Sequence, residues 1–128
     1  MAGPYEFDTE PGTADACSTL VDSLPDQVAD LSSDPVDSTR VAAWGDPRVV
    51  LRCGVTPPAD LRPESRCDDV DGVGWFTEEQ DDSTVFTTIG RSPLVSVTVP
   101  GDYDPAGAAL IDLADAITAG TTVESPCV

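Results

Sequence analysis

The stretch AAWGDPRVVLRCGV, residues 42–55, contains a turn that leads into an alternating strand ending at a cysteine. Gly45-Asp46-Pro47 is typical of a turn, and Pro47 cannot donate a backbone hydrogen bond within a central strand. The residues that follow alternate between two faces, with Val49, Leu51 and Cys53 on one side and Arg48, Val50 and Arg52 on the other. We therefore predict a half-buried strand over residues 48–53.

Similar patterns predict further strands and two helices. The strands are expected near residues 73–76, 84–89 and 94–99, where β-branched and aromatic residues gather. The first helix is capped by Thr13, and Pro25 either ends it or starts a second turn that carries Val28 and Leu31. The last helix has Asp104 as its cap, Pro105 at its first position and Gly120 just past its end.

The order of these elements predicts the fold class. A chain of 128 residues has the size of one domain. A helix, four strands and a helix, joined by hairpin-length connections, favour an α+β fold. We expect a mostly antiparallel sheet of about four strands, with the N- and C-terminal helices packed on one face. Residues 13–128 would form this domain, and residues 1–12 a flexible tail left by a trimmed anchor or export signal.

The four cysteines, Cys17, Cys53, Cys67 and Cys127, lack the CxxC spacing of redox and zinc motifs. Two disulfides are therefore expected, which would staple the fold, and three pairings are open on paper. The predicted elements favour Cys53–Cys67, which closes a short loop between strands, and Cys17–Cys127, which ties the chain ends together. A zinc site made of four thiolates is the alternative. Disulfides require an oxidising compartment, so we expect an extracytoplasmic location.

The charge of the chain narrows the classes of function. There are 24 acidic residues against six arginines, and there is no lysine or histidine. A formal net charge of -18 argues against nucleic acid as a partner and against direct binding to an anionic membrane surface. Without histidine, the chain cannot contain a Ser-His-Asp triad or a histidine-bearing zinc site. We expect no cofactor.

Several motifs resemble one family of proteins. They are Cys17 with Leu20 and Leu24-Pro25, the segment AWGDP leading into VVLRCG, Cys67, Gly72-Val73 with Trp75, FTT with GRS, and VTVP at residues 97–100. Together they are similar to the actinobacterial family known as domain of unknown function 3515, DUF3515, over most of the chain. The resemblance implies an exported protein that is anchored in the membrane, or a lipoprotein, and it implies no activity.

Arginine and tryptophan side chains form the first candidate site. Arg48 and Arg52 are expected on the strand face opposite the helices, with Arg91 at a turn and Trp44 at the strand entrance. Arginine recognises carboxylate or phosphate with two parallel hydrogen bonds, and tryptophan offers a flat apolar surface. An anionic small ligand or an envelope protein could bind there. The simpler interpretation is that these arginines pair with internal acids and that the tryptophans belong to the core.

The acidic residues suggest two alternatives. In the stretch CDDVDGVGWFTE, Asp69, Asp71 and Glu78 fall at positions three, five and twelve of a calcium-binding loop. The position-one residue is Cys67, however, and a solvated turn before a strand explains the same acids. A pair of carboxylates drawn from Asp46, Asp69, Asp71, Glu78 and Glu79 could hydrolyse a glycan if two of them faced each other.

These observations favour a binding or accessory module of the cell envelope over an enzyme. An open sheet face can serve as a docking surface without any catalytic group. A carboxylate-dependent enzyme acting on an envelope glycan is one alternative, and a structural domain steadied by calcium is the other.

Overall fold

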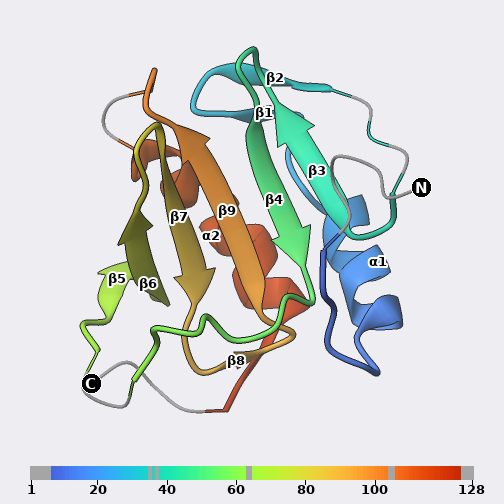
Figure 1. The fold of residues 1–128 in the computed structure, drawn as a ribbon. Coiled ribbons are helices and arrows are strands. Elements are labelled where there is room, and N and C mark those ends of the chain that lie inside the picture. Colours follow the sequence, from blue (N-terminus) through green and yellow to red (C-terminus); the bar gives the residue numbers. More distant parts are fainter. Residues whose placement is uncertain (1–6, 35, 37, 63–64, 104–105, 125–128) are drawn as a thin grey trace.

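An antiparallel sheet forms the centre of the computed structural model, which describes residues 7–34, 36, 38–62, 65–103 and 106–124 (Figure 1). Within these residues the sheet has eight strands in the order β1-β2-β3-β4-β9-β7-β6-β5. The strands are β1 Gln27–Val28, β2 Leu31–Asp34, β3 Val41–Trp44, β4 Val49–Cys53, β5 Asp68–Val70, β6 Val73–Glu79, β7 Ser83–Thr88 and β9 Val95–Pro100. A small separate ladder pairs β8 Arg91–Ser92 with β10 Thr122–Val123.

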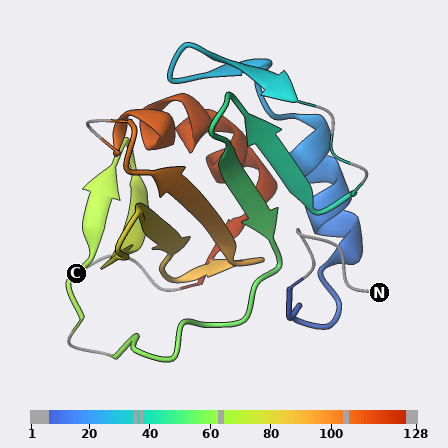
Figure 2. The same cartoon turned by 45° about the horizontal axis from the view of Figure 1, so that its top comes forward.

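Both helices lie behind the sheet in Figure 1, and Figure 2 shows the same arrangement from a second angle. The helices are α1 Ala14–Asp22 and α2 Ala108–Gly120. They contact each other, and the side chain of Leu20 packs so closely on Gly120 that a Cβ there would lie 2.8 Å from Leu20 Cδ1. The predicted α+β class, with an antiparallel sheet and two helices on one face, is therefore confirmed.

The main core lies between the sheet and the helices. Inward-facing strand residues such as Leu51 and Val97 are buried against Leu113 and Ile117 of α2. A smaller cluster covers part of the opposite face, where Phe7 and Val36 pack against Val41, Ala43 and Val50. The alternation predicted for β4 explains both clusters, because successive side chains point to opposite faces of the sheet.

The number of strands differs from the prediction of about four. The four predicted strands correspond to β4, β6, β7 and β9, which are adjacent and form the middle of the sheet. The strands of this sheet that were not predicted flank this middle on both sides; they are β1, β2, β3 and β5. The two strands of the small ladder, β8 and β10, were not predicted either. Leu31 was expected on a helical turn if the helix continued past Pro25, but residues 31–34 form β2.

The WGDP segment is the turn of the β3–β4 hairpin. Trp44 pairs with Val49 across the hairpin, and Gly45 to Arg48 form the connection. Gly45 has a φ of +82°, and a Cβ at this position would lie 2.9 Å from Leu31 Cδ1. The positive φ favours glycine at this position, and a Cβ would also require the side chain of Leu31 on β2 to shift.

The disulfide pairing predicted from the sequence is wrong. Cys17 of α1 bonds to Cys53 of β4, with a Cα–Cα distance of 5.5 Å. Cys53–Cys67 cannot form, because β4 and β5 are separated by β9, β7 and β6, a spacing of roughly 19 Å against a limit of about 7 Å. Cys17–Cys127 is excluded by the bond to Cys53. Cys67 is also disulfide-bonded, and Cys127 lies outside the described residues.

The segment before α1 lies against the sheet. Thr9 forms an isolated bridge with Val55, and the backbone N–H of Glu10 donates to the Gly54 carbonyl. Thr9 and Glu10, which belong to the segment predicted as a tail, thus contact the chain just after β4. The last helix begins at Ala108, later than expected, and the predicted cap Asp104 and first residue Pro105 lie outside the described part of the chain.

Candidate functional site

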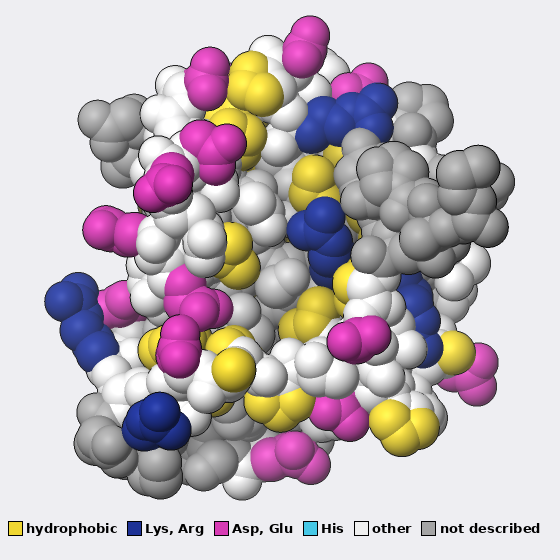
Figure 3. Space-filling model, in the orientation of Figure 1, with side chains coloured by type: hydrophobic (Ala, Val, Ile, Leu, Met, Phe, Trp, Pro, Cys, Tyr) yellow, Lys and Arg dark blue, Asp and Glu magenta, His cyan; other side chains and the backbone are white. Residues whose placement is uncertain are grey.

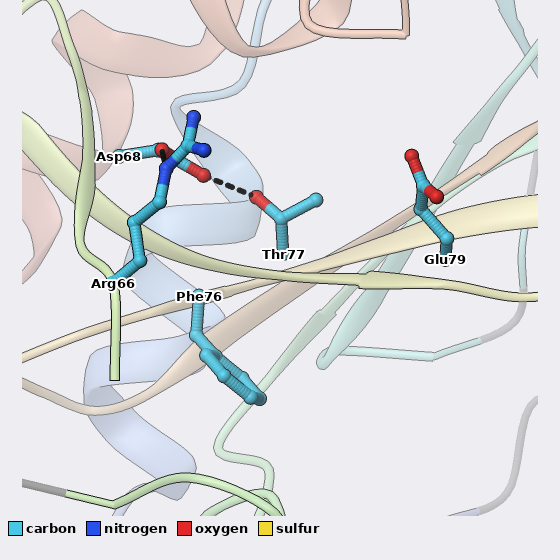
Figure 4. Close-up of a pocket in the computed structure, with 5 residues that line it drawn as sticks. All are labelled: Arg66, Asp68, Phe76, Thr77 and Glu79. Atoms are coloured by element: carbon cyan, nitrogen blue, oxygen red, sulfur yellow. Dashed lines mark hydrogen bonds and ion pairs between the residues drawn. The ribbon is translucent and has the colours of Figure 1, made fainter. Parts of the chain in front are cut away.

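A cavity of about 410 Å³ lies at the edge of the sheet where β5 begins beside β6 (Figure 4). It is lined by Arg66, Asp68, Phe76, Thr77 and Glu79. Asp68 is the first residue of β5, and Arg66 lies two residues before it. Phe76, Thr77 and Glu79 belong to β6. Asp68, Thr77 and Glu79 point to one side of β6 in Figure 4, and Phe76 points to the other.

The strand β6 is longer than its partner β5, which leaves part of its edge open. Strand β5 pairs only with Val73 to Trp75. On the other side of β6, the Gly74 carbonyl accepts from Ile89 and the Gln80 N–H donates to Ser83. In an antiparallel ladder the bonding direction alternates along the strand, so the backbone groups of Thr77 and Glu79 point away from β7. In the described part of the chain, no strand pairs with them there.

Asp68 is held as a carboxylate beside this edge. The Thr77 hydroxyl donates to Asp68 Oδ2 at 2.9 Å, and Arg66 Nε donates to Asp68 Oδ1 at 2.5 Å. The hydrogen bond from Thr77 lowers the pKa of Asp68 most, and the hydrogen bond and charge of Arg66 lower it further, against the opposite effect of burial. Asp68 is therefore ionised at neutral pH, and its oxygens are already occupied by donors.

The rest of the site combines an apolar ring with several acidic side chains. Phe76 is half-buried, and Glu79 is exposed. Glu78 lies between them on β6, and Asp81 and Asp82 follow in the turn to β7. Figure 3 shows acidic side chains gathered along this side of the molecule, on the left of the view. The site thus offers backbone groups, an aromatic surface and carboxylates.

Two of the residues predicted to contact a ligand are buried structural groups. Trp44 is 1% exposed, and its Nε1 donates to the Pro25 carbonyl at 3.1 Å. Arg91 is 8% exposed, and its guanidinium donates to Thr121 Oγ1 and to the Gly72 carbonyl. Arg91 therefore ties the β5–β6 turn to the end of α2. Trp44 thus belongs to the core. The partners of Arg91 are a hydroxyl and a backbone carbonyl instead of the acids that the simpler interpretation expected.

The other two predicted arginines lie on or near β4. Arg48 forms an ion pair with Asp34, with 3.5 Å between Nε and Oδ2. Arg52 lies on the face opposite the helices, as predicted, and its Nη1 donates to Thr98 Oγ1 at 3.4 Å. Both make further interactions. The four residues Trp44, Arg48, Arg52 and Arg91 are not brought together into one site.

The acids of the predicted calcium loop are also spread apart. Asp69 and Asp71 lie at the β5–β6 hairpin, where Asp69 Oδ1 accepts from the Gly72 N–H at 3.1 Å. Glu78 lies towards the other end of β6. Within the described residues, no group of three or more His, Cys, Asp or Glu side chains could hold a metal ion.

Sequence reasoning missed most of the cavity residues. Glu79 was considered only as one of several acids, and Arg66, Asp68, Phe76 and Thr77 were not considered. The sequence does carry one signal, since Arg66 lies two residues before Asp68 and can reach it along an extended chain. The lengths of β5 and β6, which leave the edge open, have no comparable signature.

Comparison with known proteins identifies the family. The chain matches the family described as protein of unknown function, DUF3515, over residues 4–125, and it belongs to this family. No curated protein matches the chain, and no solved structure does. Among the described residues, no helix is long and apolar enough to cross a membrane.

Proposed function

We propose that this domain is a non-catalytic binding module that recognises a partner protein of the cell envelope through the open edge of β6. The observation that carries the proposal is the direction of the backbone groups of Thr77 and Glu79, which face outward beside a cavity lined by Phe76. Open sheet edges pair readily with other chains, and proteins that keep one exposed often use it for recognition.

The state of Asp68 supports binding over acid catalysis at this cavity. Glycoside hydrolysis requires one carboxylic acid that stays protonated near neutral pH, so its pKa must be raised. The pKa of Asp68 is shifted in the opposite direction by Thr77 and Arg66. Asp68 is suited to orient Arg66 and Thr77 at the rim of the site, and it is not suited to donate a proton.

The disulfide supports a location outside the cytoplasm. Cys17–Cys53 joins α1 to the sheet, and stable disulfides of this kind form in oxidising compartments. We propose that the domain is exported and held at the membrane by an anchor. Protein isolated from its native host without reductant should show no reactive thiol. Four reactive thiols would contradict this location.

Site-specific photo-crosslinking tests the binding role. Benzoylphenylalanine placed at position 79 should crosslink to a defined envelope protein, because this side chain is exposed at the open edge. The control places the same group at position 111 on α2, where Ile111 is 56% exposed on the opposite face. The crosslinked partner is then purified, and its affinity for the unmodified domain is measured.

Two outcomes would contradict the proposal. If both positions crosslink to the same mixture of proteins, the edge has no specific partner. If purified envelope glycan releases reducing sugar in the presence of the wild type, and the Asp68→Asn and Glu79→Gln variants lose this activity, then the cavity is a catalytic site and the enzyme alternative is correct.

A further inference from the structure

We infer that the partner binds as an extended segment that carries lysine or arginine and adds a strand to β6. This inference rests on the proposed function and specifies the chemistry of its partner. It combines three features of the same edge: backbone groups that no strand pairs with in the described part of the chain, a cavity beside an aromatic ring, and several acidic side chains.

The backbone of β6 provides the pairing. Thr77 and Glu79 each present one N–H donor and one carbonyl acceptor on the side away from β7. A segment of three or more extended residues can bond to all of them in the same way as β5 bonds to Trp75 and Val73. Because β5 begins only at Asp68, opposite Trp75, the added strand would pair with the part of β6 beyond β5 without displacing it.

The side chains of β6 favour an alternating partner. Successive residues of an added strand point to opposite faces of the sheet. On one face they meet the half-buried ring of Phe76, and on the other they meet Thr77 and Glu79 (Figure 4). The cavity of about 410 Å³ beside these residues has room for such side chains. Apolar residues therefore suit the Phe76 face, and basic residues suit the Glu79 face.

The charge of the edge selects a basic segment over a second copy of this chain. Glu78, Glu79, Asp81 and Asp82 gather at one end of β6, and the chain as a whole carries a formal charge of -18. Two β6 edges paired with each other would bring their glutamates together, and like charges in such positions are destabilising. A segment with lysine or arginine opposite Glu79 replaces this repulsion by attraction.

A synthetic peptide tests the inference directly. The probe is acetyl-Thr-Lys-Val-Lys-Val-Thr-amide, which alternates basic and apolar side chains. In a titration of the ¹⁵N-labelled full chain, the largest shifts should occur at the amides of Thr77 and Glu79 and at their neighbours. Two control peptides should bind at least about tenfold more weakly, one with alternate N-methylated residues that cannot pair, and one with glutamate in place of lysine.

Variants of Glu79 separate backbone pairing from charge. Glu79→Gln should weaken peptide binding about threefold, because only a cross-strand charge pair is lost. Glu79→Pro should weaken it about tenfold, since proline also removes an outward-facing N–H while remaining compatible with an edge strand. Asp69→Pro is the matched control, because it removes one acid and one outward N–H from β5, and it should leave the affinity unchanged.

The outcomes distinguish this inference from the proposed function. Equal binding of the N-methylated peptide, or shifts centred away from β6, would overturn strand addition. Equal binding of the glutamate peptide would overturn the basic partner. If the crosslinked envelope protein binds tightly but protects no amide of β6, strand addition is wrong. The domain is then still a binding module, but it binds through a different surface. The Gln variant keeps the test independent of any effect of proline on folding.

Discussion

Arg40 is a residue whose role only the three-dimensional structure reveals. Its guanidinium donates to Thr13 Oγ1 at 2.9 Å and to the Cys53 carbonyl at 3.3 Å, and it lies 3.6 Å from Cys17 Sγ. It therefore joins the start of α1 to the end of β4 beside the disulfide. Gly54 leaves the room for it, because a Cβ there would overlap with Arg40 Nη1.

Replacing Arg40 should destabilise the fold. Arg40→Met keeps the aliphatic stem and removes the donors, and the free energy of unfolding should fall by about 2 kcal/mol, since hydrogen bonds from charged groups are worth about 1.5–3 kcal/mol. Urea denaturation without reductant measures the change. The control is Arg62→Met, which alters an exposed arginine. Equal midpoints for the two variants would show that Arg40 contributes nothing beyond its stem.

The two tryptophans should respond differently to the same substitution. Trp44 is 1% exposed and donates to the Pro25 carbonyl, whereas Trp75 is 0% exposed and its Nε1 has no hydrogen-bond partner in the described structure. Both Trp→Phe changes remove volume from the core. Only Trp44→Phe also breaks a hydrogen bond, so it should cost about 1 kcal/mol more than Trp75→Phe in urea denaturation. A larger cost for Trp75→Phe would contradict this assignment.

Asp68 should make stability depend on pH. Its pKa is lowered in the folded state, first by the hydrogen bond from Thr77 and then by Arg66. The stabilisation is therefore present above the unfolded pKa of about 3.9 and is lost as the pH falls through the lower folded value. The stability difference between the wild type and Asp68→Asn should shrink over this window. Urea unfolding of the two proteins at several pH values measures it.

The residue scale also shows where prediction from the sequence fails. The alternation that places Arg52 opposite the helices is visible in the sequence and proved correct. The burial of Arg91 is not visible, because its acceptors lie at Gly72 and Thr121, 19 and 30 residues away in the chain. A contact between distant segments leaves no local pattern, so Arg91 could not be separated from a ligand-binding arginine.

The strands that were predicted and those that were missed differ in their side chains. The middle strands β4, β7 and β9 are rich in valine, threonine and other residues that favour strands, and their alternation reflects burial. Strand β3 contains two alanines, and β5 contains two aspartates, which are depleted in strands. These flanking strands form because a neighbour offers its backbone groups, and that neighbour is known only once the topology is known.

The β5–β6 hairpin depends on one glycine for its backbone conformation. Asp71 and Gly72 have φ values of +50° and +90°, as expected for a two-residue hairpin turn. A Cβ on Gly72 would meet nothing within 4 Å, so the cost of Gly72→Ala comes from the backbone alone. The variant should lower the free energy of unfolding by about 1 kcal/mol.

A second glycine provides the control for this prediction. A Cβ on Gly107 also meets nothing within 4 Å, but its φ is -67°, which any residue adopts. Gly107→Ala should therefore leave the stability nearly unchanged, and thermal unfolding of both variants compares them. Equal losses of stability in the two variants would show that the positive φ of Gly72 is not the reason why Gly72→Ala destabilises the fold.

For the whole molecule, the sequence predicts the layers better than the path of the chain. The two helices on one face follow from their apolar stripes and from hairpin-length connections. These features do not predict that the chain crosses from β4 to the far edge of the sheet, or that β9 inserts between β4 and β7. This path separates Cys53 from Cys67 and places Cys53 beside α1, so the disulfide pairing could not be predicted before the topology.

The net charge of -18 should act in opposite directions on folding and on binding. Repulsion among the acids opposes the compact state, whereas the same acids attract a basic partner segment. Salt screens both effects, since the Debye length falls from about 10 Å at 0.1 M to about 3 Å at 1 M. Raising NaCl from about 0.1 to 1 M should therefore increase the melting temperature and weaken binding of the lysine peptide.

Calcium at the same ionic strength separates general screening from a specific site. Screening alone predicts the same rise in melting temperature with NaCl and with CaCl₂, because ionic strength sets the Debye length. A larger rise with CaCl₂ that disappears in Asp69→Asn and Asp71→Asn would instead show that calcium steadies the hairpin between β5 and β6. A melting temperature that falls with NaCl would mean that attractive ion pairs, such as Arg48–Asp34, outweigh the repulsion among the acids.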